Sequence, residues 1–256
     1  MSTGQHARDL LERGYTILPR THDAATVETI RTRLAAIHRA HGAPAPYSAK
    51  DRPLSEHALL NPTGFVLFEL LGLAPELAPL LLSPALVDVA REVLGEDAFL
   101  ELTGAVVSDS GRPFFSWHNH IGGIDVEAFR ASGVFPRFER SERLIAVVYL
   151  DEIDEDTGPL VALPRRIDEP TEPQRDLRTQ HWDGEVLLTF PRGSTLVFEQ
   201  CTWHAVRTQK RDGLRMFVGT YFASRRAPPT QSIDRSLVGL RGGGSLLRSV
   251  LREPGD

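Results

Sequence analysis

The sequence predicts a mainly β protein in which flanking helices form an N-terminal layer over a strand-rich body. One observation is a change of pattern near residue 97, because helical segments precede it and short apolar runs separated by turns follow it. The other is size, because 256 residues with 41% hydrophobic content can bury a large core, often as one domain in strand-rich enzymes. We therefore expect a single domain over residues 1–256, with three parts: a helical cover at about 1–96, a β core at about 97–224 and a C-terminal tail at about 225–256.

The helical layer begins with a short helix at residues 5–13, which Gly14 ends. A short strand follows at residues 15–18, and Pro19 stops it. Asp23 then caps a longer helix. The apolar residues of this helix recur every three or four positions and predict one buried stripe: Val27, Ile30, Leu34 and Ile37.

Residues 42–48 contain two prolines and predict a connector, after which the sequence stays polar to His57. The next helix has the clearest signals, with Ser83 as N-cap, Pro84 in the first helical position and Gly95 as the stop. Its apolar face predicts a packing role: Leu86, Val89, Ala90, Val93 and Leu94.

Short strands are expected from about residue 98 onward. The run at 143–150 is uninterrupted apolar after Arg143, which is typical of a strand buried on both faces. Other apolar runs predict further strands: 160–164, 185–190, 194–198 and 216–222. The connection from Asp125 to Glu142 is long and rich in charge and aromatics, so it is either a lid or a surface loop without function.

Three histidines and one arginine predict the functional site. On extended backbone, the two-residue side-chain period turns His118 and His120 to the same face, where both rings can bind one metal ion. The best third ligand is His204, which follows the strand predicted at 194–198. Arg215 opens the next apolar run and can hold the carboxylate of an acidic co-substrate whose other end the metal binds.

Charge and composition exclude several classes of partner. A formal net charge of −5 gives no basic field for nucleic acid or anionic lipid, so a small-molecule partner is favoured. No apolar run approaches the roughly 20 residues that span a bilayer. With Cys201 as the only cysteine, no internal disulfide forms, and the first residues lack a signal-peptide apolar region. We expect a soluble, cytoplasmic protein.

Other chemistries lack their motifs. Neither the Gly-x-Ser-x-Gly turn of serine hydrolases nor the Gly-x-Gly-x-x-Gly turn of dinucleotide-binding folds occurs. The acidic segment 151–157 lacks the spacing of a calcium loop, and the glycines at 242–244 are not followed by the Lys-Ser or Lys-Thr of a phosphate loop. By alternation, Trp117 and Trp203 face away from the metal and pack in the core, and Cys201 is expected to be buried.

From about Gly14 to Phe222 the chain resembles the phytanoyl-CoA dioxygenase family of iron(II)- and 2-oxoglutarate-dependent oxygenases. The resemblance depends on the order and spacing of short pieces: 14–19 before a long helix, 83–95, Ser116-Trp117-His118, 150–152, Thr157-Gly158-Pro159-Leu160, Leu163-Pro164, the His204 strand and Arg215. It implies a double-stranded β-helix, or jelly roll. It also implies iron(II), 2-oxoglutarate and molecular oxygen acting on a small organic substrate.

The family's metal site matches this sequence unevenly. Family members normally use a His-x-Asp pair and a distal His, which His118 and His204 match, and Arg215 matches the residue that pairs with the distal carboxylate of 2-oxoglutarate. His120 occupies the position of the Asp. The favoured outcome is a three-histidine iron site; alternatives are ligation by Asp125, or a weak or absent metal. Halogenation is disfavoured, because halogenating relatives need a small residue there.

Two other classes of function remain open, and a third is rejected. An iron dioxygenase with three histidines can act without 2-oxoglutarate, and a jelly roll can bind a ligand without catalysis. A cupin is disfavoured, because His204 lies far beyond the turn at 191–193. The sequence identifies neither the substrate nor the oligomeric state, and it does not rank Glu101, Arg112 and Arg143 as pocket residues.

Overall fold

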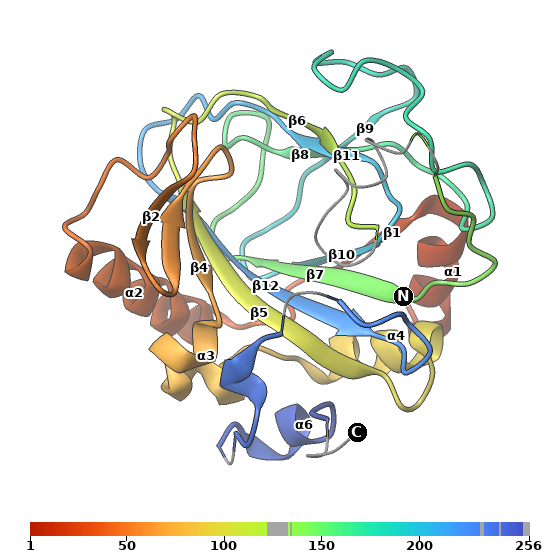
Figure 1. Ribbon diagram of the computed structural model, residues 1–256, viewed down its shortest axis with the longest axis horizontal. Helices are drawn as coiled ribbons and strands as arrows, with labels where there is room; N and C mark the ends of the chain where they lie inside the picture. Colours follow the sequence, from red (N-terminus) through yellow and green to blue (C-terminus); the bar gives the residue numbers. More distant parts are fainter. Residues whose placement is uncertain (122–132, 134, 231–232, 241, 253–256) are drawn as a thin grey trace.

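In a computed structural model of the chain, the described residues are 1–121, 133, 135–230, 233–240 and 242–252. Their strands form two antiparallel sheets that face each other, as expected for a jelly roll (Figure 1). The larger sheet has the order β1-β10-β7-β12-β5-β4-β3-β2 and the smaller sheet the order β6-β11-β8-β9.

The strands of the larger sheet are β1 (Tyr15–Leu18), β2 (Arg52–Ser55), β3 (Ala58–Leu60), β4 (Phe65–Phe68), β5 (Phe99–Ser108), β7 (Arg143–Tyr149), β10 (Thr195–Glu199) and β12 (Arg215–Ala223). Those of the smaller sheet are β6 (Phe115–His118), β8 (Leu160–Ala162), β9 (Val186–Leu188) and β11 (His204–Val206). All seven residues of β7 are buried, which confirms the prediction from its uninterrupted apolar run.

The helices lie mainly on the side of the larger sheet that faces away from the smaller one (Figure 1). They are α1 (Thr3–Arg13), α2 (Ala24–Ala40), α3 (Leu70–Leu73), η1 (Pro75–Leu80), α4 (Pro84–Leu94), η2 (Arg235–Leu237) and α6 (Gly244–Arg248). The predicted caps are confirmed, since Asp23 accepts from the Thr26 amide, Ser83 accepts from the Leu86 amide, and Gly14 ends α1 at φ 78°.

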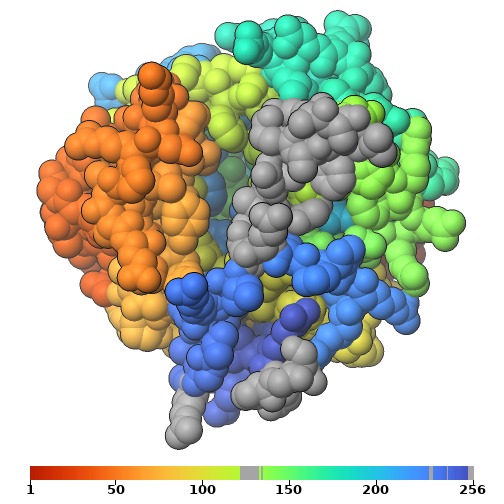
Figure 2. All heavy atoms as spheres, viewed as in Figure 1, coloured from red at the N-terminus to blue at the C-terminus, as the bar shows by residue number. Residues whose placement is uncertain are grey.

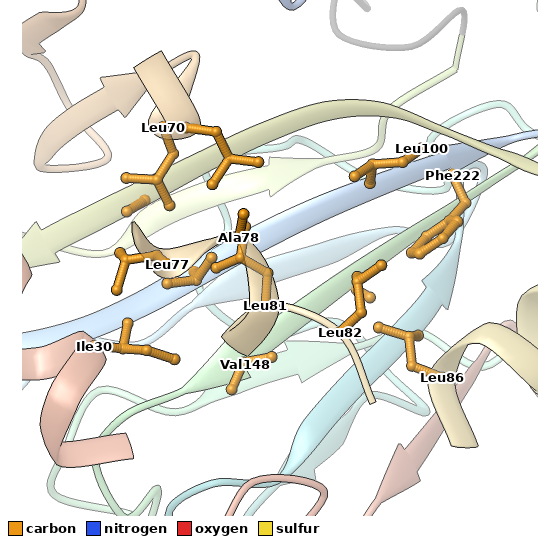
Figure 3. Packing of buried hydrophobic residues seen from close by; sticks show 14 of the residues in the cluster. Ile30, Leu70, Leu77, Ala78, Leu81, Leu82, Leu86, Leu100, Val148 and Phe222 are labelled. Carbon is orange, nitrogen blue, oxygen red and sulfur yellow. The ribbon is translucent and has the colours of Figure 1, made fainter. Parts of the chain in front are cut away.

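The main core fills the space between these helices and the larger sheet (Figure 3). Ile30 of α2 and Leu86 of α4 are fully buried there, and Val148 and Phe222 meet them from β7 and β12. Because this core fixes β7 and β12 on their outer face, the opposite face of the same strands is held in place to line a site.

Residues 1–96 contribute four strands to the larger sheet as well as helices. Strand β1 confirms the strand predicted at residues 15–18, whereas β2 to β4 are not part of the predicted helical cover. Strand β2 is largely exposed at the edge of the sheet, so its residues show no alternation of apolar and polar side chains. The connection expected at 125–142 is described only in part. Residues 125–132 and 134, which include Asp125, lie outside the described residues.

No helix within the described ranges combines the length and the apolar character that crossing a membrane requires.

Candidate active site

The structure brings the three predicted histidines together at one end of the smaller sheet. His118 ends β6 and His204 begins β11, and the two residues lie opposite each other in the antiparallel register. His120 follows two residues later, where its amide donates to the carbonyl of Gln200 at 2.8 Å. One ring nitrogen from each histidine lies within 4.8 Å of the others, so one metal ion can reach all three.

Backbone carbonyls fix the tautomers of two of these rings. The Nδ1 of His118 lies 2.9 Å from the carbonyl oxygen of Ser116, and the Nδ1 of His204 lies 2.9 Å from that of Thr202. Because a carbonyl oxygen only accepts, Nδ1 carries the hydrogen in each neutral ring and Nε2 keeps the lone pair that a metal needs. The donor set therefore fits a metal ion.

Burial favours the neutral form of two of the three rings. It lowers the pKa of His120 to about 3, with the neighbouring His118 as the second cause. It also lowers the pKa of His204 well below its ordinary value, again with His118 contributing. Neutral imidazole is the form that ligates metals, so both rings are in the ligating form at neutral pH.

The two tryptophans beside the ligands face away from the histidine cluster, as predicted. Trp117 is fully buried and stacks on Trp182, with ring centroids 4.5 Å apart and planes 15° apart. Trp203 packs in the same cluster and donates from Nε1 to the carbonyl of Thr171 at 3.1 Å. This second core holds β6 and β11 from behind the histidines.

The turn at residues 200–203, which delivers His204, is held by buried polar groups. Glu199 is fully buried; its carboxylate accepts from the Cys201 amide at 2.8 Å and pairs with Arg165 at 3.3 Å. The Thr202 hydroxyl donates to the carbonyl of Gly14 at 2.7 Å, which ties the turn to the end of α1. Cys201 is a free, buried cysteine, as expected from the sequence.

Arg215 lies at the start of β12, opposite Ser108 of β5, and only 3% of it is exposed. Its Nη2 donates to the Tyr149 hydroxyl at 3.1 Å, and its guanidinium carbon lies 5.0 Å from the centroid of that ring. The next amide, of Met216, donates to the Asp151 carboxylate at 2.8 Å. These contacts fix the guanidinium on the face of the larger sheet that points toward the smaller sheet.

A cavity of about 370 Å³ between the sheets contains this arginine and the three histidines. Its remaining walls are mostly apolar: Val66, Val106, Phe115, Ile145, Val147, Leu160, Phe198, Val206, Phe217 and Tyr221. Arg112, which the sequence does not rank, also lines it. Glu101 and Arg143 do not, since they form a buried ion pair with each other at 2.9 Å.

A second cavity of about 510 Å³ adjoins the first and is lined by β4, β5, β12 and residues 233–235. The two cavities meet at His120, because they share five wall residues: Val66, Val106, His120, Phe217 and Tyr221. In Figure 2 the surface is hollowed beside the orange segment that contains β2, β3 and β4. A pocket of this size beside a cluster of histidines is the usual place for an organic ligand.

Comparisons with known proteins show the family and the fold. The sequence profile of the phytanoyl-CoA dioxygenase family (PhyH) matches residues 10–217. A comparison with curated protein sequences finds no match.

Among solved structures, the fold is similar to that of the non-heme alpha-ketoglutarate-dependent carbocyclase SnoK from nogalamycin biosynthesis, at 20% identity and a TM-score of 0.65 over 96% of this chain and 95% of that one. HygX from Streptomyces hygroscopicus, with nickel and 2-oxoglutarate bound, has 14% identity and a TM-score of 0.62, over 95% of this chain and 96% of HygX. EctD from S. alaskensis, with 2-oxoglutarate and 5-hydroxyectoine, has 20% identity and a TM-score of 0.61, over 89% of this chain and 77% of EctD.

Proposed function

This chain belongs to the phytanoyl-CoA dioxygenase family of iron(II)- and 2-oxoglutarate-dependent dioxygenases, and from that premise we propose that it oxidises a small organic substrate at a three-histidine iron site. The observation that carries the proposal is the convergence of three ring nitrogens within 4.8 Å of one another, in a cavity that also contains Arg215.

His118, His120 and His204 would hold the iron. The tautomers of His118 and His204 present Nε2 to the cavity, and the low pKa of His120 keeps its ring available as a ligand. When bound, the ferrous ion supplies the redox chemistry that couples decarboxylation of 2-oxoglutarate, to succinate and carbon dioxide, to oxidation of the substrate by molecular oxygen.

The protein's own groups orient the co-substrate. Arg215 would pair with the carboxylate of 2-oxoglutarate that lies away from the iron, because a guanidinium matches a carboxylate with two parallel hydrogen bonds. The Tyr149 hydroxyl accepts from Arg215 and limits its rotation. The apolar walls exclude water, which strengthens each of these electrostatic contacts.

The larger cavity would hold the organic substrate, since it reaches His120 without passing Arg215. Its inner wall is mainly apolar, with Val66, Leu67, Val106 and Phe217 among the lining residues. A substrate with an apolar body would therefore place its reacting carbon near the three histidines and undergo hydroxylation or a related oxidation.

Anaerobic reconstitution with iron(II) tests the proposal. The wild-type protein should bind one iron, develop a visible charge-transfer absorption when 2-oxoglutarate is added, and release succinate on exposure to oxygen. His118→Ala, His120→Ala and His204→Ala should each lose iron binding. His181→Ala is the matched control, because that side chain is 77% exposed and should leave iron binding unchanged.

Other results would favour the rival functions. Oxygen consumption without succinate would indicate a dioxygenase that ignores 2-oxoglutarate, and failure to retain iron would indicate a binding protein. Asp125→Ala tests the alternative third ligand: if it loses iron while His120→Ala keeps it, the assignment of His120 is wrong. His120→Asp should retain iron, because it restores the family's usual carboxylate.

A further inference from the structure

Arg112 is a second buried cation in the cavity that contains Arg215. Only 2% of Arg112 is exposed, and its Nη1 and Nη2 donate to the carbonyl oxygens of Pro113 and Arg207, both at 2.8 Å. Within the described ranges, neither arginine forms an ion pair. The cavity wall contains no aspartate or glutamate among the described residues.

The fold holds Arg112 in this place. It lies in the connection between β5 and β6, four residues beyond Ser108, which is itself opposite Arg215 in the register. Gly158 packs against the guanidinium at φ 70°, and a Cβ there would lie 3.3 Å from Nη2 of Arg112 and 3.0 Å from the carbonyl oxygen of Arg207. The guanidinium is therefore positioned before any ligand arrives.

Two buried cations without a counter-charge are costly. Burial lowers the pKa of Arg112 to about 9, and the charge of Arg215 is the second cause. The three histidines that line the same cavity supply no negative charge in either protonation state. In addition, Nε of Arg215 is buried without a hydrogen-bond partner. An anion between the two guanidinium groups would satisfy that donor and offset both charges.

We propose that Arg112 and Arg215 together form a carboxylate-binding site, which captures the end of 2-oxoglutarate far from the iron and does so without the metal. The identity of the ligand rests on the proposed function, whereas the two-arginine site rests on the cavity alone. Arg112 is then a binding residue that helps to select a dicarboxylate co-substrate.

Calorimetric titration of the metal-free full-length protein with succinate tests this proposal, because succinate keeps the carboxylate that lies far from the iron in 2-oxoglutarate and lacks the keto group. Arg112→Met should weaken succinate binding at least about tenfold, equivalent to about 1.4 kcal/mol, because a charge-assisted contact in a dry cavity is lost. Arg112→Lys keeps the charge but not the planar fork and should bind with intermediate affinity. Titrations are made at constant ionic strength.

Arg33→Met is the matched control, since Arg33 lies on α2 and pairs with Glu76 outside the cavity. This variant should bind succinate with the affinity of the wild type. Thermal unfolding without ligand shows whether each variant is folded. A purely structural role for Arg112 predicts a lower midpoint with unchanged succinate affinity, and that result would overturn the proposal. If Arg112→Met does not fold, wild-type affinity in Arg112→Lys overturns it instead.

The two hypotheses fail separately. Loss of succinate binding in Arg112→Met supports the two-arginine site even if iron and 2-oxoglutarate give no turnover. Conversely, succinate release by the iron-loaded wild type supports the oxygenase even if the metal-free protein does not bind succinate, which would overturn the proposal for Arg112.

Discussion

Glu199 is predicted to make the stability of this protein fall as pH rises. Burial raises the pKa of its carboxyl group from 4.5 to about 7, although the Cys201 amide and Arg165 favour the charged form. The folded state therefore holds this proton more tightly than the unfolded state. The resulting stabilisation is complete below the unfolded pKa and is lost as pH rises through the folded one.

The size of the effect follows from the two pKa values. Between pH 5 and pH 8, ionisation of the carboxyl group is less favourable in the folded state than in the unfolded state. The free energy of unfolding therefore falls by about 2.5 kcal/mol over this range. Glu199→Gln keeps an oxygen that accepts from the Cys201 amide but does not titrate. The difference in free energy of unfolding between wild type and variant should thus change by about 2.5 kcal/mol over this range.

Urea unfolding at several pH values, followed by circular dichroism with a chelator present, measures this difference. The buried histidines titrate in both proteins, so their contributions cancel. A difference that stays constant from pH 5 to pH 8 would refute the reasoning, because it would mean that Glu199 is ionised throughout and that Arg165 fully offsets its burial.

Three further predictions concern the turn before His204. Gly14→Ala should lower the free energy of unfolding by about 2 kcal/mol or more, because a Cβ at φ 78° would lie 2.3 Å from Oγ1 of Thr202; an unchanged urea midpoint would contradict this. Thr202→Val removes one of the two donors to the buried Gly14 carbonyl, which still accepts from the Glu199 amide, and should cost about 0.5–1.5 kcal/mol, whereas Thr29→Val, which removes a similar bond on the exposed face of α2, should cost less. Burial raises the pKa of the Cys201 thiol, so a disulfide reagent should modify it only after unfolding, and rapid labelling of the native protein would argue against this.

Much of the fold could be predicted because its signals are local. The caps at Asp23 and Ser83 and the apolar run of β7 each lie within a few residues of the element they specify. The three histidines were also accessible, because alternation relates His118 to His120 and a clear strand precedes His204. The sequence did not show that these segments lie side by side. The antiparallel pairing of β6 with β11 brings them together.

The features that the sequence did not predict depend on distant partners. Arg112 is one charged residue in a connection, and only the pairing of Ser108 with Arg215 brings it to the cavity. Glu199 ends an apolar strand, where a carboxylate is ordinarily exposed; the ion pair with Arg165 that accommodates it forms across 34 positions of sequence. Strand β2 lies at a solvent-exposed edge and therefore lacks apolar alternation.

The pairing of β1 with β10 has a consequence for biosynthesis. Tyr15 leaves the ribosome early but finds its partner, Phe198, only when most of the polypeptide has been made. Until then the nascent chain exposes an unpaired strand edge, which invites aggregation and makes chaperones useful. Such a distant pairing also favours slow folding. Since β10 leads into the turn before His204, the three histidines also meet only late in the life of the growing chain.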